Sequence, residues 1–170
     1  MKKKILKYSI LFLSSIAVGC NDWLDVQPKS QVKEEELFKS EAGFREALTG
    51  IYTLMGRTTT YGGNNTMGFI DMIAQTYSSV NSGYTKALSY DYKDNAVKDI
   101  IDTMWNSNYN AIANCNYLLK NIAEKGSVMN EDLRQLVEGE ALALRAFQHF
   151  VLLRGYAPSF KMGYNERAFP

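Results

Sequence analysis

The sequence predicts an all-α fold of antiparallel helix pairs with long irregular loops. Apolar residues recur every three or four positions in three separate stretches, which is the period of an amphipathic helix. A polar residue suited to capping a helix precedes two of these stretches, and a glycine follows each of the three. The chain has 170 residues, 46% of them hydrophobic, so it can bury the core of one globular domain.

The first 19 residues predict a secretory signal peptide. They begin with the basic run MKKKILK, continue with a largely apolar run and end with small residues before a cysteine. The apolar run covers 12 residues. A helix that spans a membrane needs about 20 apolar residues, so we do not expect a transmembrane segment here.

Cys20 is the predicted lipidation site. The sequence Ala17-Val18-Gly19-Cys20 resembles the lipobox of bacterial lipoproteins, in which the cysteine is acylated and becomes the new N-terminus. Fatty chains on this residue would tether a folded domain to a membrane surface. The alternative interpretation is an ordinary secretory signal with an incidental cysteine nearby.

Residues 20–33 predict an extended leader, because they are polar, contain Pro28 and show no helical period. We expect the helical domain from residue 34 to residue 170. After a short turn over residues 34–38, Ser40 is placed to cap the first long helix, which ends near Gly56. Four apolar residues at helical spacing define its core face: Phe44, Leu48, Ile51 and Met55.

Residues 57–94 lose this pattern and are rich in glycine, asparagine, serine, threonine and tyrosine. A loop longer than about 12–15 residues inside a compact domain is usually functional or contains an overlooked element. We therefore expect either a binding surface or a further helix here. The run FIDMIAQTY, residues 69–77, is the best candidate for that helix.

The second long helix is predicted over residues 95–124, with Gly126 placed to end it. Its apolar stripe includes Cys115, which we expect to be a buried core thiol. The residues of the stripe are Val97, Ile101, Trp105, Asn108, Ile112, Cys115, Leu119 and Ile122.

The third long helix is predicted to begin after Asn130, with Glu131 and Asp132 in its positive first turn. Gly155 and Pro158 are placed to stop it. Apolar residues occupy nearly all of its faces, and a helix of this kind is usually buried on all sides. We therefore expect other helices to wrap it.

Glu140, Arg145 and His149 interrupt the apolar surface of this third helix. Glu140 and Arg145 lie about 140° apart by helical period, so each needs a partner on a neighbouring helix. We interpret both as buried polar groups that lock one helix to another. A general base would require a cleft and a second catalytic group, and the chain contains one histidine in total.

Neither an enzyme, nor a metal site, nor a cofactor is expected. One histidine and one internal cysteine cannot supply the three or four ligands of a zinc site, and HExxH, CxxC, GxSxG, Walker and GxGxxG motifs are absent from the sequence. Without the signal segment the chain has 15 basic and 18 acidic residues, a net charge of −3. Because the chain is mildly acidic and has no stripe of basic residues to bind phosphate groups, we do not expect a nucleic-acid partner.

Four motifs together resemble the N-terminal region of the SusD/RagB family. They are CNDWLDVQP from Cys20, the EAL-TGIY run ending at Tyr52, the pattern of Trp105, Tyr109, Ile112 and Asn116, and GEALALRAF followed by Leu152, Arg154 and Tyr156-Ala157-Pro158. We expect structural roles for Trp105, Tyr109, Asn116, Glu140 and Arg145. Members are longer than this chain, which looks like a truncated N-terminal fragment.

The resemblance implies a scaffold of tetratricopeptide-like helix pairs and a function in nutrient uptake. Family members are lipoproteins of the Gram-negative outer membrane that bind glycans or peptides and cap a SusC-like TonB-dependent transporter. By this resemblance the chain would be an outer-membrane protein, lipid-anchored at Cys20 and facing the cell exterior. It would capture an oligosaccharide or a peptide for the transporter.

The ligand is expected to contact the segment that the helical pattern leaves unassigned. Sugars bind to aromatic ring faces and planar polar side chains, and this segment supplies both. The candidate ligand-binding residues are Asp71, Gln75, Tyr77, Asn81, Tyr84, Tyr90 and Tyr92. The tyrosines could equally cover a helix pair or contact a partner protein. The alternative function is a lipid-anchored helical adaptor that binds peptides or proteins on a concave face.

Overall fold

A computed structural model describes residues 34–77 and 82–157 of the chain. This part of the chain is helical and contains no strand, which confirms the predicted all-α class. Its elements are α2 (Glu34–Leu37), α3 (Glu41–Met55), α4 (Phe69–Ile73), the 3₁₀ turn η2 (Ser82–Tyr84), α5 (Thr85–Leu88), α6 (Asn95–Lys125), the 3₁₀ turn η3 (Gly126–Val128) and α7 (Glu131–Tyr156). Cys20 and Asn81 lie outside the described residues.

Side-chain caps begin each of the three long helices. Ser40 Oγ accepts a hydrogen bond from Gly43 N at the start of α3, and Asn130 Oδ1 accepts one from Leu133 N at the start of α7. Both caps are as predicted. Asp94, which precedes α6, accepts from the amides of Ala96 and Val97. The α7 helix continues through Gly155 and ends at Tyr156.

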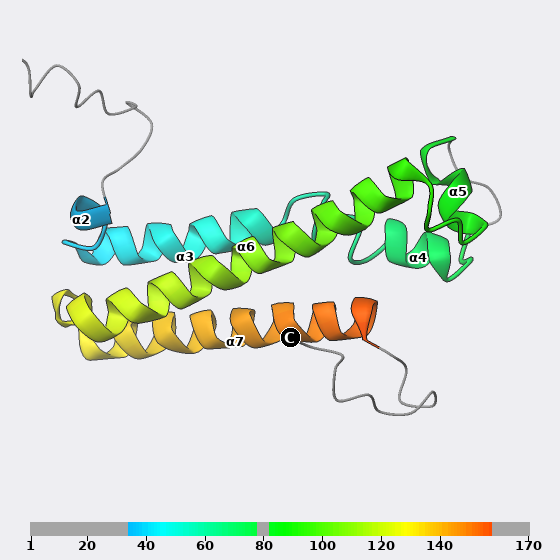
Figure 1. Ribbon diagram of the computed structural model, residues 1–170. Coiled ribbons are helices and arrows are strands. Elements are labelled where there is room, and N and C mark those ends of the chain that lie inside the picture. Colours follow the sequence, from blue (N-terminus) through cyan, green and yellow to red (C-terminus); the bar gives the residue numbers. More distant parts are fainter. Residues whose placement is uncertain (1–33, 78–81, 158–170) are drawn as a thin grey trace, which may run out of the picture. The chain divides into compact units, whose positions relative to one another are not determined.

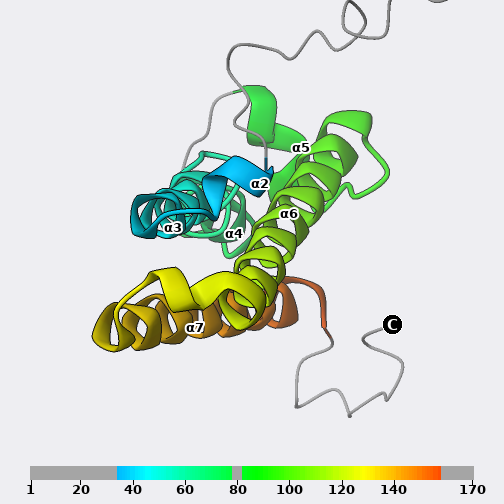
Figure 2. The ribbon, with the colours of Figure 1, turned by 90° about the vertical axis from the view of Figure 1, so that its left-hand side faces the viewer.

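The three long helices pack side by side. Figure 1 shows that α3 and α7 run in the same direction and that α6 runs antiparallel to both. In the end-on view of Figure 2, α6 lies beside both α3 and α7. Together with α2 they enclose the larger hydrophobic core. Its fully buried members include Phe38, Phe44, Ile51, Leu118 and Val137.

A second, smaller core lies where α4 and α5 pack against the N-terminal half of α6 (Figure 1). Phe69, Ala87, Val97 and Met104 form its buried centre. The single helix α6 therefore contributes to both cores. No helix in residues 34–77 or 82–157 combines the length and apolarity needed to cross a membrane.

The loop between α3 and α4 is held by buried hydrogen bonds. The Thr60 hydroxyl lies 2.9 Å from the carbonyl oxygen of Leu54 and 2.8 Å from that of Met55. It can therefore donate a hydrogen bond to the carbonyl groups that have no helical partner at the C-terminal end of α3. Asn65 Nδ2 donates to Asn108 Oδ1 at 2.8 Å, and both side chains are buried. These bonds fix residues 57–68 against α3 and α6.

Paired side chains line one seam between α6 and α7, and four of the five predicted structural residues lie there: Trp105, Tyr109, Asn116 and Arg145. The Trp105 ring is 4.8 Å from that of Tyr109 and 4.9 Å from that of Tyr156, between ring centres. The Tyr109 ring meets His149 edge-on at 6.4 Å. Farther along the seam, Arg145 Nη1 donates to Asn116 Oδ1 at 2.9 Å.

Glu140 forms a hydrogen bond with a residue of α3. Its Oε2 accepts a hydrogen bond from Tyr52 Oη of α3 at 2.7 Å, and this bond raises the pKa of Tyr52, with desolvation adding to the shift. Glu140 and Arg145 therefore each have a partner on a neighbouring helix. Both are half-exposed, however, so the expectation that they are buried polar groups is wrong.

At the opposite end of the seam, the Tyr156 hydroxyl connects α7 to α6. It donates to the Ile101 carbonyl at 2.8 Å. Burial and the nearby Asp102 carboxylate raise the pKa of Tyr156 to about 12, so its hydroxyl stays protonated at neutral pH and remains a donor. The end of α7 is thereby fixed to α6.

The expectation that other helices wrap α7 is wrong for the described residues. One side of α7 is buried, but Leu136 is 56% exposed and Phe150 is 53% exposed on the opposite side. Apolar residues on nearly all sides of a helix are consistent with two separate packing faces. The described residues cover one of these faces of α7.

Candidate ligand-binding cleft

A cleft lies between the C-terminal part of α7, from Phe147 onward, and the segment that carries α4. Its larger part, which we call the polar cavity, has a volume of about 420 Å³. An adjoining apolar cavity has a volume of about 260 Å³, and a small space of about 30 Å³ shares lining residues with both. Ile70 contributes to all three spaces. The polar cavity is lined by Tyr61, Asn65, Thr66, Met67, Ile70, Asp71, Phe147, Val151 and Arg154.

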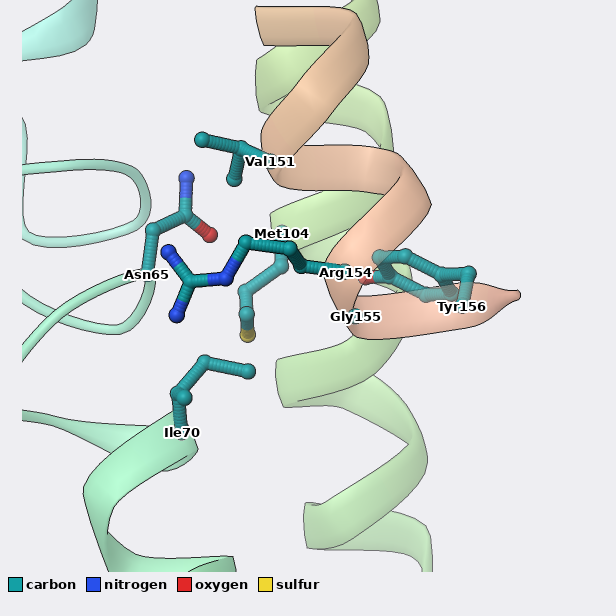
Figure 3. A pocket seen from close by; sticks show the side chains of 7 residues that line it. All are labelled: Asn65, Ile70, Met104, Val151, Arg154, Gly155 and Tyr156. Carbon is teal, nitrogen blue, oxygen red and sulfur yellow. The ribbon is translucent and has the colours of Figure 1, made fainter. Parts of the chain in front are cut away.

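Arg154 is the cationic group of the cleft. Figure 3 shows its side chain extending from α7, with the guanidinium between Asn65 and Ile70. Within residues 34–77 and 82–157, no carboxylate oxygen lies within 4.0 Å of this guanidinium. Its carbon lies 5.9 Å from the centre of the Phe150 ring. The guanidinium can therefore donate hydrogen bonds to a bound molecule.

Tyr61 and Phe147 form the aromatic wall. Their ring centres are 5.4 Å apart and the rings meet edge-on, at 74°. The two residues come from the α3–α4 loop and from α7, and they are 51% and 37% exposed. This pair presents ring surface to the cavity while each ring holds the other in place.

Asp71 supplies the acidic group of the polar cavity and is the predicted ligand residue that the structure places there. It stands in the first turn of α4, a helix that follows Gly68 and contains Phe69 as its buried anchor. Its carboxylate can accept hydrogen bonds from hydroxyl groups. Together Asp71 and Arg154 offer an acceptor and a donor in one cavity.

Three other predicted ligand residues use their hydroxyls within the protein. Tyr77 Oη donates to the Met67 carbonyl at 3.1 Å, Tyr84 Oη to Asn64 Oδ1 at 3.2 Å, and Tyr90 Oη to the Ile73 carbonyl at 3.0 Å. These bonds connect Tyr77, Tyr84 and Tyr90 to the stretch of residues 64–73. The structure does not bring these tyrosines into the polar cavity.

Tyr92 and Gln75 have different positions. Tyr92 lines the apolar cavity with Ile73 and Tyr156, and its ring centre is 6.3 Å from that of Tyr90. Gln75 is exposed and follows α4 with a φ of 56°, and Tyr90 has a φ of 58°. Residues with side chains seldom adopt this left-handed conformation, so these two positions mark sharp reversals of the chain.

Tyr61, Phe147 and Arg154 were not among the predicted ligand residues. Arg154 could have been noticed because residues 146–156 contain no other aspartate, glutamate, lysine or arginine, and Tyr61 as an aromatic residue beside Gly62 and Gly63. Their proximity could not be found, because 86 positions separate Tyr61 from Phe147 and no periodic pattern connects them. The tertiary fold alone places them in one cleft.

The chain matches a known family over nearly its whole length. Residues 22–168 match the SusD-like family described as starch-binding and associating with the outer membrane. The SusD-like protein P25 of Formosa agariphila is 25% identical to this chain over 167 residues. The alignment covers 93% of this chain but only 31% of that relative, so the chain spans about a third of the relative's length.

No solved structure matches the chain. The family match extends from the residues just after Cys20 to beyond the end of α7, and so includes both helical cores and every residue of the cleft. SusD-like proteins are binding proteins and not enzymes. The chain therefore belongs to the SusD-like family of starch-binding proteins that associate with the outer membrane.

Proposed function

We propose that this chain is part of a cell-surface nutrient-binding protein and that its polar cavity binds an oligosaccharide. The observation that carries the proposal is the convergence of an aromatic pair, a carboxylate and a guanidinium on one cavity of about 420 Å³. Ring faces contact the C–H surfaces of a sugar, while Asp71 and Arg154 can bind its hydroxyl groups. A cavity of this size accommodates a small number of sugar units.

The chemistry of the cavity favours a sugar over an apolar peptide side chain. Asp71 and Arg154 lie in the same cavity as Tyr61 and Phe147, so an apolar group that filled it would bury two charges without hydrogen bonds. A sugar hydroxyl can both donate to a carboxylate and accept from a guanidinium. Family membership, with its starch-binding description, supports the same choice.

Isothermal titration of the whole chain with maltoheptaose, followed by a panel of other oligosaccharides, tests the site. Tyr61→Ala is expected to weaken binding about tenfold because it removes stacking surface, and Arg154→Ala is expected to weaken it by a similar factor. The matched controls are Tyr52→Ala and Arg45→Ala, which remove the same side chains from α3, outside the cleft. Equal affinities in all four variants would contradict the proposed site, and no binding to any sugar would contradict the proposed function.

We further propose that the domain is anchored in the outer membrane by lipid on Cys20. The Ala-Val-Gly-Cys sequence supports this anchor, and the family is associated with the outer membrane. Two or three acyl chains bind a bilayer stably, since each buried CH₂ contributes about 0.8 kcal/mol. In this arrangement the cleft would deliver its ligand to a SusC-like TonB-dependent transporter.

Cys20→Ser is expected to move the protein from the membrane fraction to the soluble fraction. Cys115→Ser is the matched control, because Cys115 is a buried core thiol on α6 and its replacement leaves the lipidation site intact. Fractionation followed by immunoblotting measures both variants. Membrane association that survives Cys20→Ser would show that another feature of the chain is the anchor.

A further inference from the structure

Asn108 is an amide on the apolar stripe of α6, and it is fully buried. An amide among apolar side chains is costly unless hydrogen bonds satisfy it. Along α6 it lies between the buried residues of the smaller core, which end at Met104, and those of the larger core, which begin at Ala111. Asn108 therefore marks the boundary between the two cores.

The hydrogen bonds of Asn108 connect α6 to the α3–α4 loop. Asn108 Nδ2 donates to the Met104 carbonyl, one turn earlier in α6, at 2.7 Å. Asn108 Oδ1 accepts from Asn65 Nδ2 at 2.8 Å, and a longer bond of 3.4 Å runs from Asn108 Nδ2 to Asn65 Oδ1. Because a carbonyl can only accept, the Met104 carbonyl sets which end of the Asn108 amide faces the loop.

Asn65 connects this buried pair to the wall of the cleft. It is 5% exposed, yet it lines both the polar cavity and the adjoining small space, where Figure 3 shows its side chain. Its backbone nitrogen donates to the Thr60 carbonyl at 2.9 Å, and the Thr60 hydroxyl lies 2.8 Å from the Met55 carbonyl oxygen. The loop is therefore held at one side by α3 and at the other by Asn108.

Tyr61 takes its position from the loop backbone on both sides of it. Thr66 Oγ1 donates to the Tyr61 carbonyl at 3.0 Å. A Cβ atom on Gly62 would lie 2.0 Å from the Gly56 carbonyl oxygen, so the chain folds back tightly on the end of α3 directly after Tyr61. A shift of this loop would move the Tyr61 ring with it.

We propose that Asn108 is a positioning residue for ligand binding, which acts through Asn65 on the loop that carries Tyr61. The inference rests on the proposed function, because it concerns the same cleft. The other half of the aromatic wall, Phe147, belongs to α7, which packs on α6. Since α6 also bonds the loop, it sets the spacing of the two rings. A wall assembled before the ligand arrives spares the ligand the cost of ordering it.

Hydrogen exchange of the full chain, measured by mass spectrometry on peptides from residues 57–70, tests the contact without a ligand. Asn108→Leu keeps the branched shape of the side chain but removes its hydrogen bonds, so exchange of the loop amides is expected to become at least tenfold faster. Asn65→Ala breaks the same bond from the loop side, leaves α6 unchanged and is expected to have the same effect. Circular dichroism verifies that the variants remain helical.

Asn121→Leu is the matched control. Asn121 is also buried on α6, and its Nδ2 likewise donates to the carbonyl one turn earlier, that of Tyr117, at 3.1 Å. Its Oδ1 has no hydrogen-bond partner among the described residues, so the amide makes no bond to the loop. We expect loop exchange in this variant to match the wild type.

Isothermal titration with maltoheptaose, or with the oligosaccharide of the panel that the wild type binds, tests the effect on the cleft. Asn108→Leu is expected to weaken binding about tenfold and Asn121→Leu to leave the affinity unchanged. In an Asn65→Ala background, Asn108→Leu is expected to have no further effect, because the bond through which it acts is already missing.

Loop exchange that Asn108→Leu accelerates no more than Asn121→Leu does would overturn the proposal. Faster exchange with unchanged affinity would overturn it as well, and so would a further tenfold loss of affinity in the Asn65→Ala background. A wild-type chain that binds no sugar would contradict the proposed function instead. The exchange rates would then still decide whether Asn108 holds the loop.

Discussion

Gly43→Ala is expected to destabilise the protein by about 2–3 kcal/mol, whereas Gly50→Ala in the same helix is expected to stabilise it. A Cβ atom at position 43 would lie 1.5 Å from the Leu37 carbonyl oxygen, so α2 would have to move away from α3. A Cβ atom at position 50 meets nothing within 4 Å. Alanine there gains about 0.5–1 kcal/mol from its higher helix propensity.

Urea denaturation followed by circular dichroism measures both glycine variants. Because the two substitutions are chemically identical and lie in one helix, their difference reports the close approach of α2 to α3. Similar stabilities for the two variants would mean that α2 does not pack on α3 as the structure shows.

Phe44→Ala is expected to cost about 3–5 kcal/mol and to leave the larger core poorly packed. Phe44 is fully buried, and its ring centre lies 4.8 Å from that of Phe38. Both rings fill the space between α2, α3 and α6, and few neighbours can move into a cavity at this point. For a domain of this size such a loss is a large part of the total stability.

Phe44→Leu serves as the control, since it keeps most of the apolar volume and is expected to cost less than about 1.5 kcal/mol. Thermal unfolding measured by calorimetry compares the two variants. If both unfolded at the wild-type temperature, Phe44 would not be part of the core that α3 and α6 share.

The helices were predictable from the sequence because their signals are local. Ser40 and Asn130 cap the two helices that they precede, and Cys115 and Ile122 are buried on α6 as their spacing predicts. The faces of α7 were harder to predict. A helix with apolar residues on both sides carries no sequence signal for which side is covered, so the exposure of Leu136 and Phe150 could not be foreseen.

The binding site was predictable only in part because its residues are distant in sequence. Asp71 was found from its location in the segment without helical pattern, but the same reasoning selected Tyr77, Tyr84 and Tyr90, whose hydroxyls bond within that segment. A tyrosine that binds a ligand and one that stabilises a loop are alike in sequence. The contact between α7 and the α3–α4 loop distinguishes them.

The 31-residue helix α6 connects the two cores without interruption. At about 1.5 Å per residue it is about 46 Å long. Its C-terminal end lies in the larger core and its N-terminal end in the smaller one, so a tilt of this helix would move the two ends relative to each other. A tilt of about three degrees at the C-terminal end would displace the N-terminal end by about 2 Å, because the displacement grows with the length of a rigid rod. Small shifts in packing far from the cleft would in this way change the width of its mouth.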